Sequence, residues 1–393
     1  MVARKGYKLT EVGEIPEDWE IHPIESLCSI TTGSRNTQDS VDDGAYPFFV
    51  RSQTVEKINS YSFDGEAVLT AGDGVGTGKI FHYINGKCDV HQRVYLMSHF
   101  SDNLLGYYFF LHFSTNFYDR VMKMTAKSSV DSVRREMIAR MPIPVPSIVE
   151  QIAIATALSD ADALIDALEQ SIAKKRQIKK GAMQELLTGK RRLPGFAGEW
   201  SVKQLGDVGQ IKSGGTPSTL RADFWDGEIP WCTPSDLTNL TCSRLLTQTS
   251  RSISQYGLKF SSAEIIPKRS LIMTTRATIG ECAINSVPMT TNQGFKNIVP
   301  FADVNVDFLY YLMSTQKNRL VSLCGGSTFL EMGKTQLLSF EILMPDYNEQ
   351  TAIANILSDM DDEIAALEAK LAKARQIKIG MMQELLTGRI RLV

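Results

Sequence analysis

Cysteine and histidine are scarce in this sequence, and neither residue type recurs at the spacing of a metal site. Six cysteines are scattered through 393 residues, without the short paired spacing that holds zinc. We therefore expect reduced and mostly buried thiols, as is typical of a cytoplasmic protein. Five histidines lie between His22 and His112, again at no metal-like spacing, which predicts structural or surface roles for them.

Long apolar runs and an excess of positive charge are also missing. No stretch approaches the ~20 apolar residues of a membrane-spanning helix, and the N-terminal residues lack the apolar run of a signal peptide. We therefore expect no membrane partner. The chain has 42 basic and 44 acidic residues, which is not the balance of a protein that binds nucleic acid alone. If DNA is the ligand, the positive surface is local or a partner supplies the rest.

Motifs of catalysis and cofactor binding are absent as well. Gly333-Lys334-Thr335 looks like the end of a P-loop, but the glycine required five residues earlier is replaced by Thr328. Residues 72–79 are rich in glycine yet fit neither GxxxxGK[ST] nor GxGxxG, so a hairpin and a backbone that approaches phosphates both stay open. HExxH, a nucleophile elbow and the Asn/Asp-Pro-Pro-aromatic motif of amino-methyltransferases are not found. The sequence predicts a non-catalytic chain.

What the sequence does contain is a long internal repeat. Residues 146–193 return as residues 345–392, identical at roughly 30 of 48 positions without a gap. Each copy begins like a helix. Ser147 can cap the first one and Glu150 can reach back to form a capping box, and the second copy repeats this pair.

Both copies have the pattern of long amphipathic helices. Their apolar residues recur in steps of four and three, as on a coiled-coil seam. Gly181 and Gly380 are the first weak points, so each helix is expected to run ~33 residues, or about 50 Å. The first halves are acidic and the second halves basic, so antiparallel packing sets opposite charges side by side. We predict an intramolecular antiparallel helix pair; two helices that pack separately on their own domains are the alternative.

The repeat extends beyond these helices into two globular segments. Trp19 and Trp200 end similar lead-in segments, and from them the sequences run in step to Gly33 and Gly214. Strand-like segments, broken by turn residues, are followed in each half by a helical segment, which argues an α+β fold. The expected strands are 46–50, 67–69, 79–84 and 93–97 in the first half and 229–232, 270–274, 281–285 and 297–300 in the second, with helices at 104–124 and 306–324.

This organisation predicts two similar domains, each followed by a long helix. The expected boundaries are 1–145 for the first globular domain, 146–193 for the first helical region, 194–344 for the second globular domain and 345–393 for the second helical region. The globular segments differ far more than the helices do. We therefore expect the two halves to have the same architectural role and to bind two different ligands.

Polar, turn-rich runs hold the residue types that read DNA. Arg suits guanine edges and Asn or Gln suits adenine edges, whereas Ser, Thr and Lys suit phosphates. Any one of these residues could equally be a solvated loop residue, so the set carries the prediction. The candidate DNA-binding residues are Arg35, Asn36, Gln38, Arg51, Gln53 and Lys79 in the first half and Lys212, Thr216, Ser218, Arg221, Ser235, Arg276, Asn292 and Gln293 in the second.

The chain resembles the specificity subunits of type I restriction–modification enzymes over nearly its whole length. The duplicated P-x-x-x-E-Q-x-x-I helical regions with LSD, RQIK and QELLTG carry this resemblance most specifically. Supporting elements are Ile229-Pro230-Trp231 and the run from Arg276 to Gly280 that precedes Asn292-Gln293. The first half has Gly-Thr-Gly-Lys, ending at Lys79, at the place comparable to Arg-Ala-Thr-Ile-Gly.

The resemblance implies a function and a set of partners. Two target recognition domains would each read one half of a split double-stranded DNA sequence, and two antiparallel helices would set the gap between the halves. Two modification subunits would bind S-adenosylmethionine and methylate adenine, and two motor-nuclease subunits would use ATP and Mg²⁺ for translocation and cleavage. This chain would bind no cofactor. Two alternatives stay open: a scaffold that joins two protein-binding domains, and an enzyme such as a methyltransferase with unrecognised motifs.

Overall fold

The computed structural model folds into two compact units. It describes residues 3–124, 132–240, 243–276, 278–324 and 331–392. Unit 1 comprises residues 1–167 and 371–393, and unit 2 comprises residues 168–370. Both units combine mainly antiparallel sheets with helices, which confirms the expected α+β fold with an internal repeat. Within the described ranges, every helix is too short or too polar to span a bilayer.

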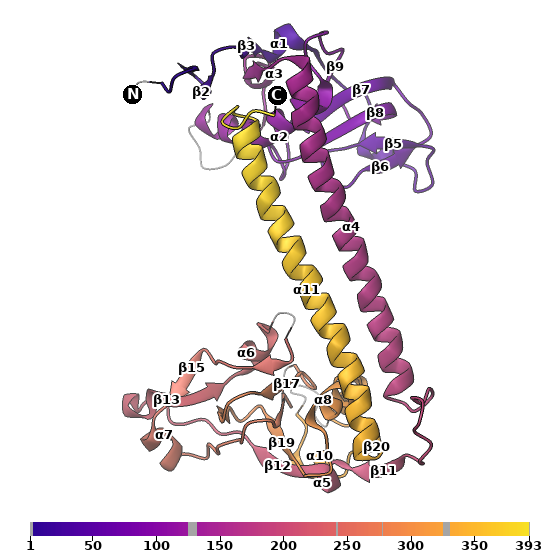
Figure 1. Cartoon of the computed structure of the whole chain (residues 1–393), viewed down its shortest axis with the longest axis vertical. Coiled ribbons are helices and arrows are strands. Elements are labelled where there is room, and N and C mark those ends of the chain that lie inside the picture. Colours follow the sequence, from indigo (N-terminus) through magenta and orange to yellow (C-terminus); the bar gives the residue numbers. More distant parts are fainter. Residues whose placement is uncertain (1–2, 125–131, 241–242, 277, 325–330, 393) are drawn as a thin grey trace. The chain divides into compact units, whose positions relative to one another are not determined.

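Unit 1 is built around a six-stranded sheet, and the helix α2 packs against its strands β7 and β8 (Figure 1). Its strands and helices are β1 (Tyr7–Thr10), β2 (Gly13–Pro16), β3 (Glu20–Pro23), α1 (Ile24–Leu27), β4 (Ser29–Thr32), the 3-10 turn η1 (Thr37–Asp39), β5 (Tyr46–Phe49), β6 (Glu56–Ile58), β7 (Phe63–Ala71), β8 (Phe81–Val90), β9 (Val94–Ser98), α2 (Gly106–Met124), α3 (Arg135–Ala139), β10 (Pro142–Val145) and the first part of α4 (Ile148–Leu186). The sheet has the order β4-β9-β7-β8-β5-β6, and its neighbours are antiparallel except for the parallel pair β5 and β8.

The core of unit 1 joins the sheet to both long helices. Val68 and Met97 of the sheet and Phe113 of α2 are fully buried in one apolar cluster. Leu158 of α4 and Leu385 at the end of α11 belong to the same cluster. The start of one long helix and the end of the other are thus part of this unit's core, because their apolar residues have no other surface to cover.

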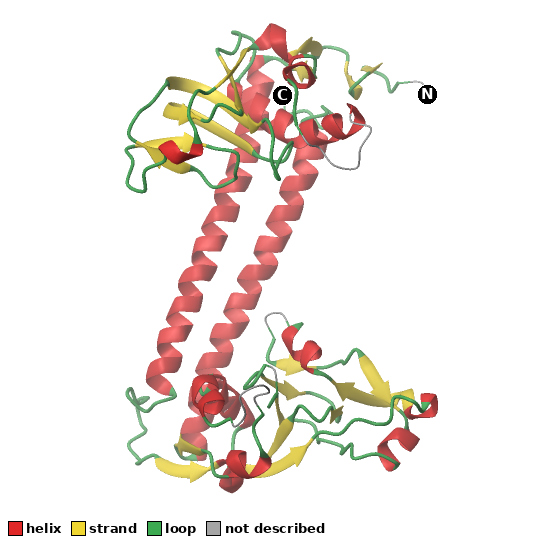
Figure 2. Cartoon of the chain, turned by 180° about the vertical axis from the view of Figure 1, so that it is seen from behind, coloured by secondary structure: helices red, strands yellow, loops and turns green. Residues whose placement is uncertain are grey.

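Unit 2 has a five-stranded and a three-stranded sheet (Figure 2). Its elements are β11 (Ser201–Gln204), α5 (Leu205–Val208), β12 (Gly209–Ser213), the 3-10 turn η2 (Ala222–Phe224), β13 (Trp225–Cys232), α6 (Pro234–Thr238), β14 (Leu245–Leu246), β15 (Arg251–Ile253), α7 (Gln255–Lys259), β16 (Leu271–Met273), β17 (Cys282–Asn285), β18 (Thr290–Thr291), β19 (Lys296–Pro300), α8 (Val306–Ser314), α9 (Lys317–Ser322), α10 (Lys334–Leu338), β20 (Glu341–Met344) and the first part of α11 (Tyr347–Leu385). The sheet orders are β12-β19-β16-β17-β14 and β15-β13-β18.

The core of unit 2 repeats the plan of unit 1. Leu186 at the end of α4 and Leu357 in α11 are buried in one cluster with Phe308 and Tyr311 of α8. The expected strands of both halves overlap β5, β7, β8, β9, β13, β16, β17 and β19, which confirms them. The prediction of one helix over 306–324 was wrong, because the chain leaves the helix after Ser314. Ser314 and Thr315 donate their hydroxyls to carbonyls three residues earlier, a bond that competes with helix continuation.

The long helices begin where the sequence predicts but end later. The Ser147 hydroxyl accepts the Glu150 N–H at 3.3 Å, so Ser147 caps α4 as expected. The glutamate does not reach back, so the predicted capping box is only half formed. Each helix has 39 residues and passes through Gly181 or Gly380, which corrects the expected length. One helix-interior glycine costs only about 1 kcal/mol relative to alanine, less than the packing beyond it provides.

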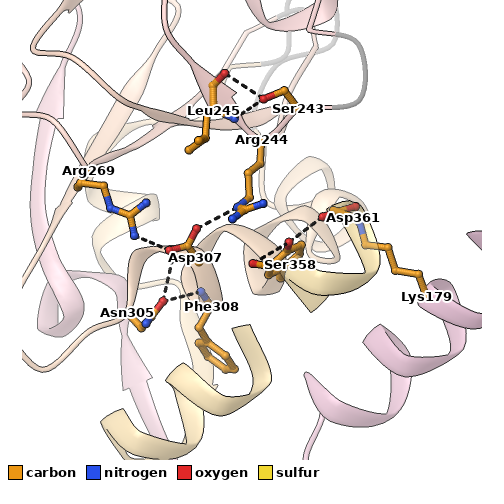
Figure 3. A network of polar contacts seen from close by, with 11 residues as sticks. Lys179, Ser243, Arg244, Leu245, Arg269, Asn305, Asp307, Phe308, Ser358 and Asp361 are labelled. Atoms are coloured by element: carbon orange, nitrogen blue, oxygen red, sulfur yellow. Dashed lines mark hydrogen bonds and ion pairs between the residues drawn. The ribbon is translucent and has the colours of Figure 1, made fainter. Parts of the chain in front are cut away.

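Opposite charges of the two helices meet inside each unit, as the antiparallel prediction requires. In unit 1, Lys378 of α11 donates to Asp162 of α4. In unit 2, Lys175 pairs with Glu363 at 2.6 Å, and Lys179 donates to Asp361, which also accepts the Tyr311 hydroxyl at 2.7 Å (Figure 3). The acidic first half of one helix therefore lies beside the basic second half of the other in both units.

Candidate nucleic-acid interface

In unit 1, a loop after β4 and a turn between β8 and β9 are joined by backbone hydrogen bonds. The Arg35 N–H donates to the Val90 carbonyl at 3.2 Å, and the Gln92 N–H donates to the Arg35 carbonyl at 2.8 Å. Gly33 makes this approach possible, since a Cβ there would lie 1.9 Å from the Val90 oxygen. The Gln92 side-chain amide donates to the Asn36 side-chain oxygen at 2.5 Å. Two candidate residues, Arg35 and Asn36, are thus held on one surface.

A buried carboxylate, that of Asp89, orients the Arg35 side chain on this surface. The fully buried Asp89 accepts from Arg35 at 3.1 Å and from the hydroxyls of Ser60 and Ser62 at 2.7 Å. Burial alone would raise the pKa of Asp89, but these donors outweigh it and lower the pKa. The carboxylate therefore stays charged and fixes the Arg35 guanidinium.

The other candidates of unit 1 are only partly gathered with this surface. Arg51 donates to Asp73 at 2.9 Å, and Asp73 also accepts from Arg93 at 2.6 Å. Gln38 is exposed in η1, and Gln53 is exposed two residues after Arg51. Lys79 lies over the Tyr118 ring of α2, with its nitrogen 4.6 Å from the ring centre. The glycine-rich run 72–79 connects β7 to the antiparallel β8, which confirms the predicted hairpin.

Unit 2 repeats the loop-against-turn arrangement at the equivalent position. The Gly215 N–H donates to the Thr291 carbonyl at 2.8 Å. A Cβ on Gly214 would lie 1.8 Å from the Asn292 oxygen, so glycine is needed there as at Gly33. Thr216 donates its hydroxyl to Gln293, which brings two candidates together. The Asn292 side-chain oxygen accepts the Gly294 N–H at 2.9 Å and shapes the turn.

Arg276 lies beside this turn, again paired with a carboxylate. Its side chain is 2.8 Å from Glu331, and a Cβ on Gly294 would lie 3.8 Å from the Arg276 Cβ. Lys296, the first residue of β19 after this turn, is only 9% exposed, and burial lowers the pKa of its amino group. Sequence reasoning missed Lys296 and Glu331, because the first directly precedes the expected strand 297–300 rather than lying in a polar turn, and the second is acidic.

The remaining candidates of unit 2 surround the turn more loosely. Lys212 is 3.7 Å from Glu264, and the Ser218 carbonyl accepts the Trp225 indole N–H at 3.1 Å. Arg221 donates twice to Asp223 and stacks on Phe224, and Ser235 is exposed in the first turn of α6. In the described residues, no hydrogen bond or ion pair joins Arg221 or Ser235 to the turn at residues 291–294.

Sequence reasoning also missed Asp73, Gln92 and Arg93 in unit 1. Arg93 was assigned to the start of an expected strand, whereas the strand begins one residue later at Val94. The backbone turn that exposes Gln92 and Arg93 is fixed by the His91 imidazole, whose Nδ1 accepts the Arg93 N–H at 3.0 Å. Burial lowers the pKa of His91, and the Arg51 charge lowers it further, so the imidazole is a neutral acceptor. The His-Gln-Arg order alone gives no signal of such a turn.

Each unit therefore has a surface of arginines and amides on turns that backbone hydrogen bonds hold in place. No three His, Cys, Asp or Glu side chains in the described part of the chain are placed to hold a metal ion. Guanidinium and amide groups on rigid turns suit the recognition of phosphates and base edges. Such a surface, present in both units, is typical of a class of protein with two related domains suited to contacts with nucleic acid.

Comparison with known proteins identifies the family. The model of the type I restriction modification DNA specificity domain matches residues 16–180 and again residues 197–376. The chain belongs to this family, which confirms the resemblance seen in the sequence. Its members are the specificity subunits of type I restriction–modification systems, a non-catalytic class.

Individual relatives agree with this assignment. The MjaIX specificity subunit of Methanocaldococcus jannaschii is 42% identical over 168 residues, which cover 42% of this chain and 39% of the relative. The putative MjaX specificity subunit of the same organism is 26% identical over an alignment that covers 98% of this chain and 97% of the relative. The crystal structure of the type I S subunit from M. genitalium has a TM-score of 0.62 and 16% identity, and covers 96% of this chain and 97% of that chain. This last likeness concerns the fold.

Proposed function

We propose that this chain reads a split sequence in double-stranded DNA, one half with each unit, and directs partner subunits to it. The single observation that carries the proposal is the loop packed against a turn at Gly33 and again at Gly214. Arginine and amide side chains lie beside it in both units, Arg35 and Asn36 in unit 1 and Arg276 and Gln293 in unit 2. Because the same backbone arrangement carries different side chains in the two units, the two units are suited to reading two different half-sites.

The partners follow from the family rather than from the chain's own groups. Two modification subunits would methylate adenine with S-adenosylmethionine, and two motor-nuclease subunits would cleave DNA with ATP and Mg²⁺. The net charge of −2 fits such a complex, because partner subunits would supply the rest of the positive surface around the DNA. The chain itself would bind none of these cofactors.

Modified-base sequencing of host DNA, with this chain present and deleted, tests the proposal. The expected result is a split motif with methyladenine in both halves that disappears on deletion. An unchanged methylation pattern in a host that expresses an intact modification subunit would contradict the proposal and favour a scaffold. Binding of S-adenosylmethionine by the isolated chain would instead favour an enzyme.

A further inference from the structure

Two arginines of unit 1 share one carboxylate on the surface already described. One carboxylate oxygen of Asp73 accepts from Arg51 at 2.9 Å, and the other accepts from Arg93 at 2.6 Å. The side chains of Arg51 and Arg93 are 39% and 59% exposed, whereas that of Asp73 is 23% exposed. The carboxylate thus lies beneath two guanidinium groups that face solvent.

Backbone hydrogen bonds fix the three chain segments that bear this triad. The His91 N–H donates to the Phe49 carbonyl at 3.0 Å, next to the segment that carries Arg51. The Gly72 N–H donates to the Arg93 carbonyl at 2.8 Å, which places Asp73 beside Arg93. A Cβ on Gly72 would lie 2.9 Å from that carbonyl oxygen, so the approach requires glycine. The arginines are therefore positioned before any ligand arrives.

Each guanidinium keeps one recognition edge open. Both arginines bind Asp73 through Nη1, and in the described residues no hydrogen-bond partner is found for their Nε and Nη2 groups. The Nε–Nη2 edge offers two parallel donors, which match two acceptors in one plane. The O6 and N7 atoms of guanine in the major groove are such a pair.

The shared carboxylate makes the triad a poor site for a phosphate. Asp73 halves the positive charge of the arginine pair and repels a phosphate that approaches between them. Burial would raise the pKa of Asp73, but the hydrogen bonds from Arg51 and Arg93 outweigh it and lower the pKa, so the repelling charge persists near neutral pH. A guanine edge is neutral and meets no such repulsion.

We propose that Arg51 and Arg93 read guanine in the half-site recognised by unit 1, with Asp73 as their positioning residue. This inference rests on the proposed function and adds to it the base that this surface selects. Arg93, which is the more exposed of the two, makes the larger contribution. Gln92, which directly precedes Arg93, donates its side-chain amide to the Asn36 side-chain oxygen. These two amides extend the surface that would contact the bases.

Substitution of each arginine by lysine tests the inference, because lysine keeps the charge and removes the two-donor edge. The chain, reconstituted with its modification subunits, methylates a library of duplexes with random bases, and sequencing reports the preferred motif. Arg93→Lys and Arg51→Lys are expected to lower the preference for guanine at one position of one half-site about ten- to hundredfold. The other half-site and the gap stay unchanged.

Arg4→Lys is the matched control, since Arg4 is an exposed arginine of unit 1 paired with Glu14 at 2.8 Å outside this surface. It is expected to leave the motif unaltered. Two results would overturn the inference: a uniform loss on all sequences, with a salt dependence shallower by about 0.9 in slope, marks phosphate contacts, and an unaltered motif marks a purely structural pair. A wild-type complex that selects no split motif refutes the proposed function itself, before any variant is compared.

Asp73→Asn separates positioning from simple masking of charge. The change keeps the size of the side chain and removes its negative charge. General DNA affinity should rise, because one repulsive charge is lost, while the preference for guanine falls several-fold, because the guanidinium groups are less firmly held. If affinity and guanine preference rise together, Asp73 only masks the arginines and its positioning role is wrong.

Discussion

At the start of each long helix, a buried glutamate binds a tryptophan and an arginine. In unit 1, Glu150 accepts the Trp19 indole N–H at 3.1 Å and two N–H groups of Arg391. In unit 2, Glu349 accepts the Trp200 indole N–H at 3.0 Å and two N–H groups of Arg192, each at 2.7 Å. This is why the glutamates do not complete the capping boxes. The repeated lead-in tryptophans of the sequence are explained by this contact.

Removal of either glutamate should be strongly destabilising. Both glutamate side chains are 1% exposed, and Arg192 is 28% exposed, so part of its charge would return to water. We expect Glu349→Ala and Glu150→Ala to lower the free energy of unfolding by roughly 2–3 kcal/mol, below the full effect of breaking a buried pair. Urea denaturation measures the loss. Glu363→Ala, which removes a 50% exposed partner of Lys175, is the control and should change stability by less than about 0.5 kcal/mol.

His112 of α2 is a buried ionisable residue with an unsatisfied atom. It is 5% exposed, and its Nδ1 has no hydrogen-bond partner in the part of the chain that the structure describes. Burial lowers the pKa of His112 to about 4, from an ordinary value near 6.5. The folded state therefore holds the neutral imidazole, whereas the unfolded chain takes up a proton below pH 6.5.

The sign of this linkage predicts acid sensitivity. Between pH 6.5 and 4 the unfolded state binds more protons at this site, so the free energy of unfolding falls as the pH falls. The shift corresponds to roughly 3 kcal/mol lost across that window. Because carboxylates also titrate there, the test is the difference between wild type and His112→Gln in urea denaturation at several pH values. Equal pH dependence of the unfolding free energy in wild type and His112→Gln would contradict the role of His112.

At the scale of elements, the antiparallel helix pair was predicted from charge because the charges of the two copies repeat. The pairs Asp162–Lys378 and Asp361–Lys179 occupy equivalent places in units 1 and 2. The helix ends were misjudged at Gly181 and Gly380, since propensity is local whereas Leu186 and Leu385 are held by the cores beyond these glycines.

Asp361 of α11 connects α4 and α11 to the helix α8 in the globular part of unit 2. It accepts from Lys179 of α4 and from the Tyr311 hydroxyl of α8, and Ser358 lies one turn away (Figure 3). We expect Asp361→Ala to cost about 1–2 kcal/mol, because the half-buried lysine and the tyrosine hydroxyl both lose a charged partner. Hydrogen exchange of α8 and α11 measures the local opening. Loss of the single exposed pair Arg191–Glu185, through Glu185→Ala, should leave exchange unchanged.

A site is harder to predict from sequence than a fold, because its residues come from distant parts of the chain. Asp307 accepts from Arg244 at 3.0 Å and from Arg269, three residues far apart in the sequence (Figure 3). Likewise, Arg51, Asp73 and Arg93 meet only because backbone hydrogen bonds join three separate turns. Hydrophobic periodicity predicts elements, since it is local, but contacts between turns depend on strand register. The candidate Arg51 was predictable by residue type, and its two partners were not.

At the scale of the molecule, the repeat gives both units the same plan with different surfaces. Each unit takes one half of α4 and one half of α11 into its core. The turns of each unit can therefore vary while the helical parts of its core stay the same. This division explains why the two helical regions are far more alike in sequence than the two globular segments.

The helices are also expected to set the gap between the two half-sites, and their length can be changed without touching either reading surface. Insertion of one heptad after Ala167 in α4 and one after Lys370 in α11 falls where each helix passes from one unit to the other and keeps the apolar seam in register. Seven residues add ~10 Å of helix, or about three base pairs. Sequencing of the methylated motif should show a wider gap with both half-sites unchanged. An insertion in one helix alone is the control, and it should abolish methylation because the charged pairs no longer match; changed half-site bases in the double insertion would contradict the role of the helices.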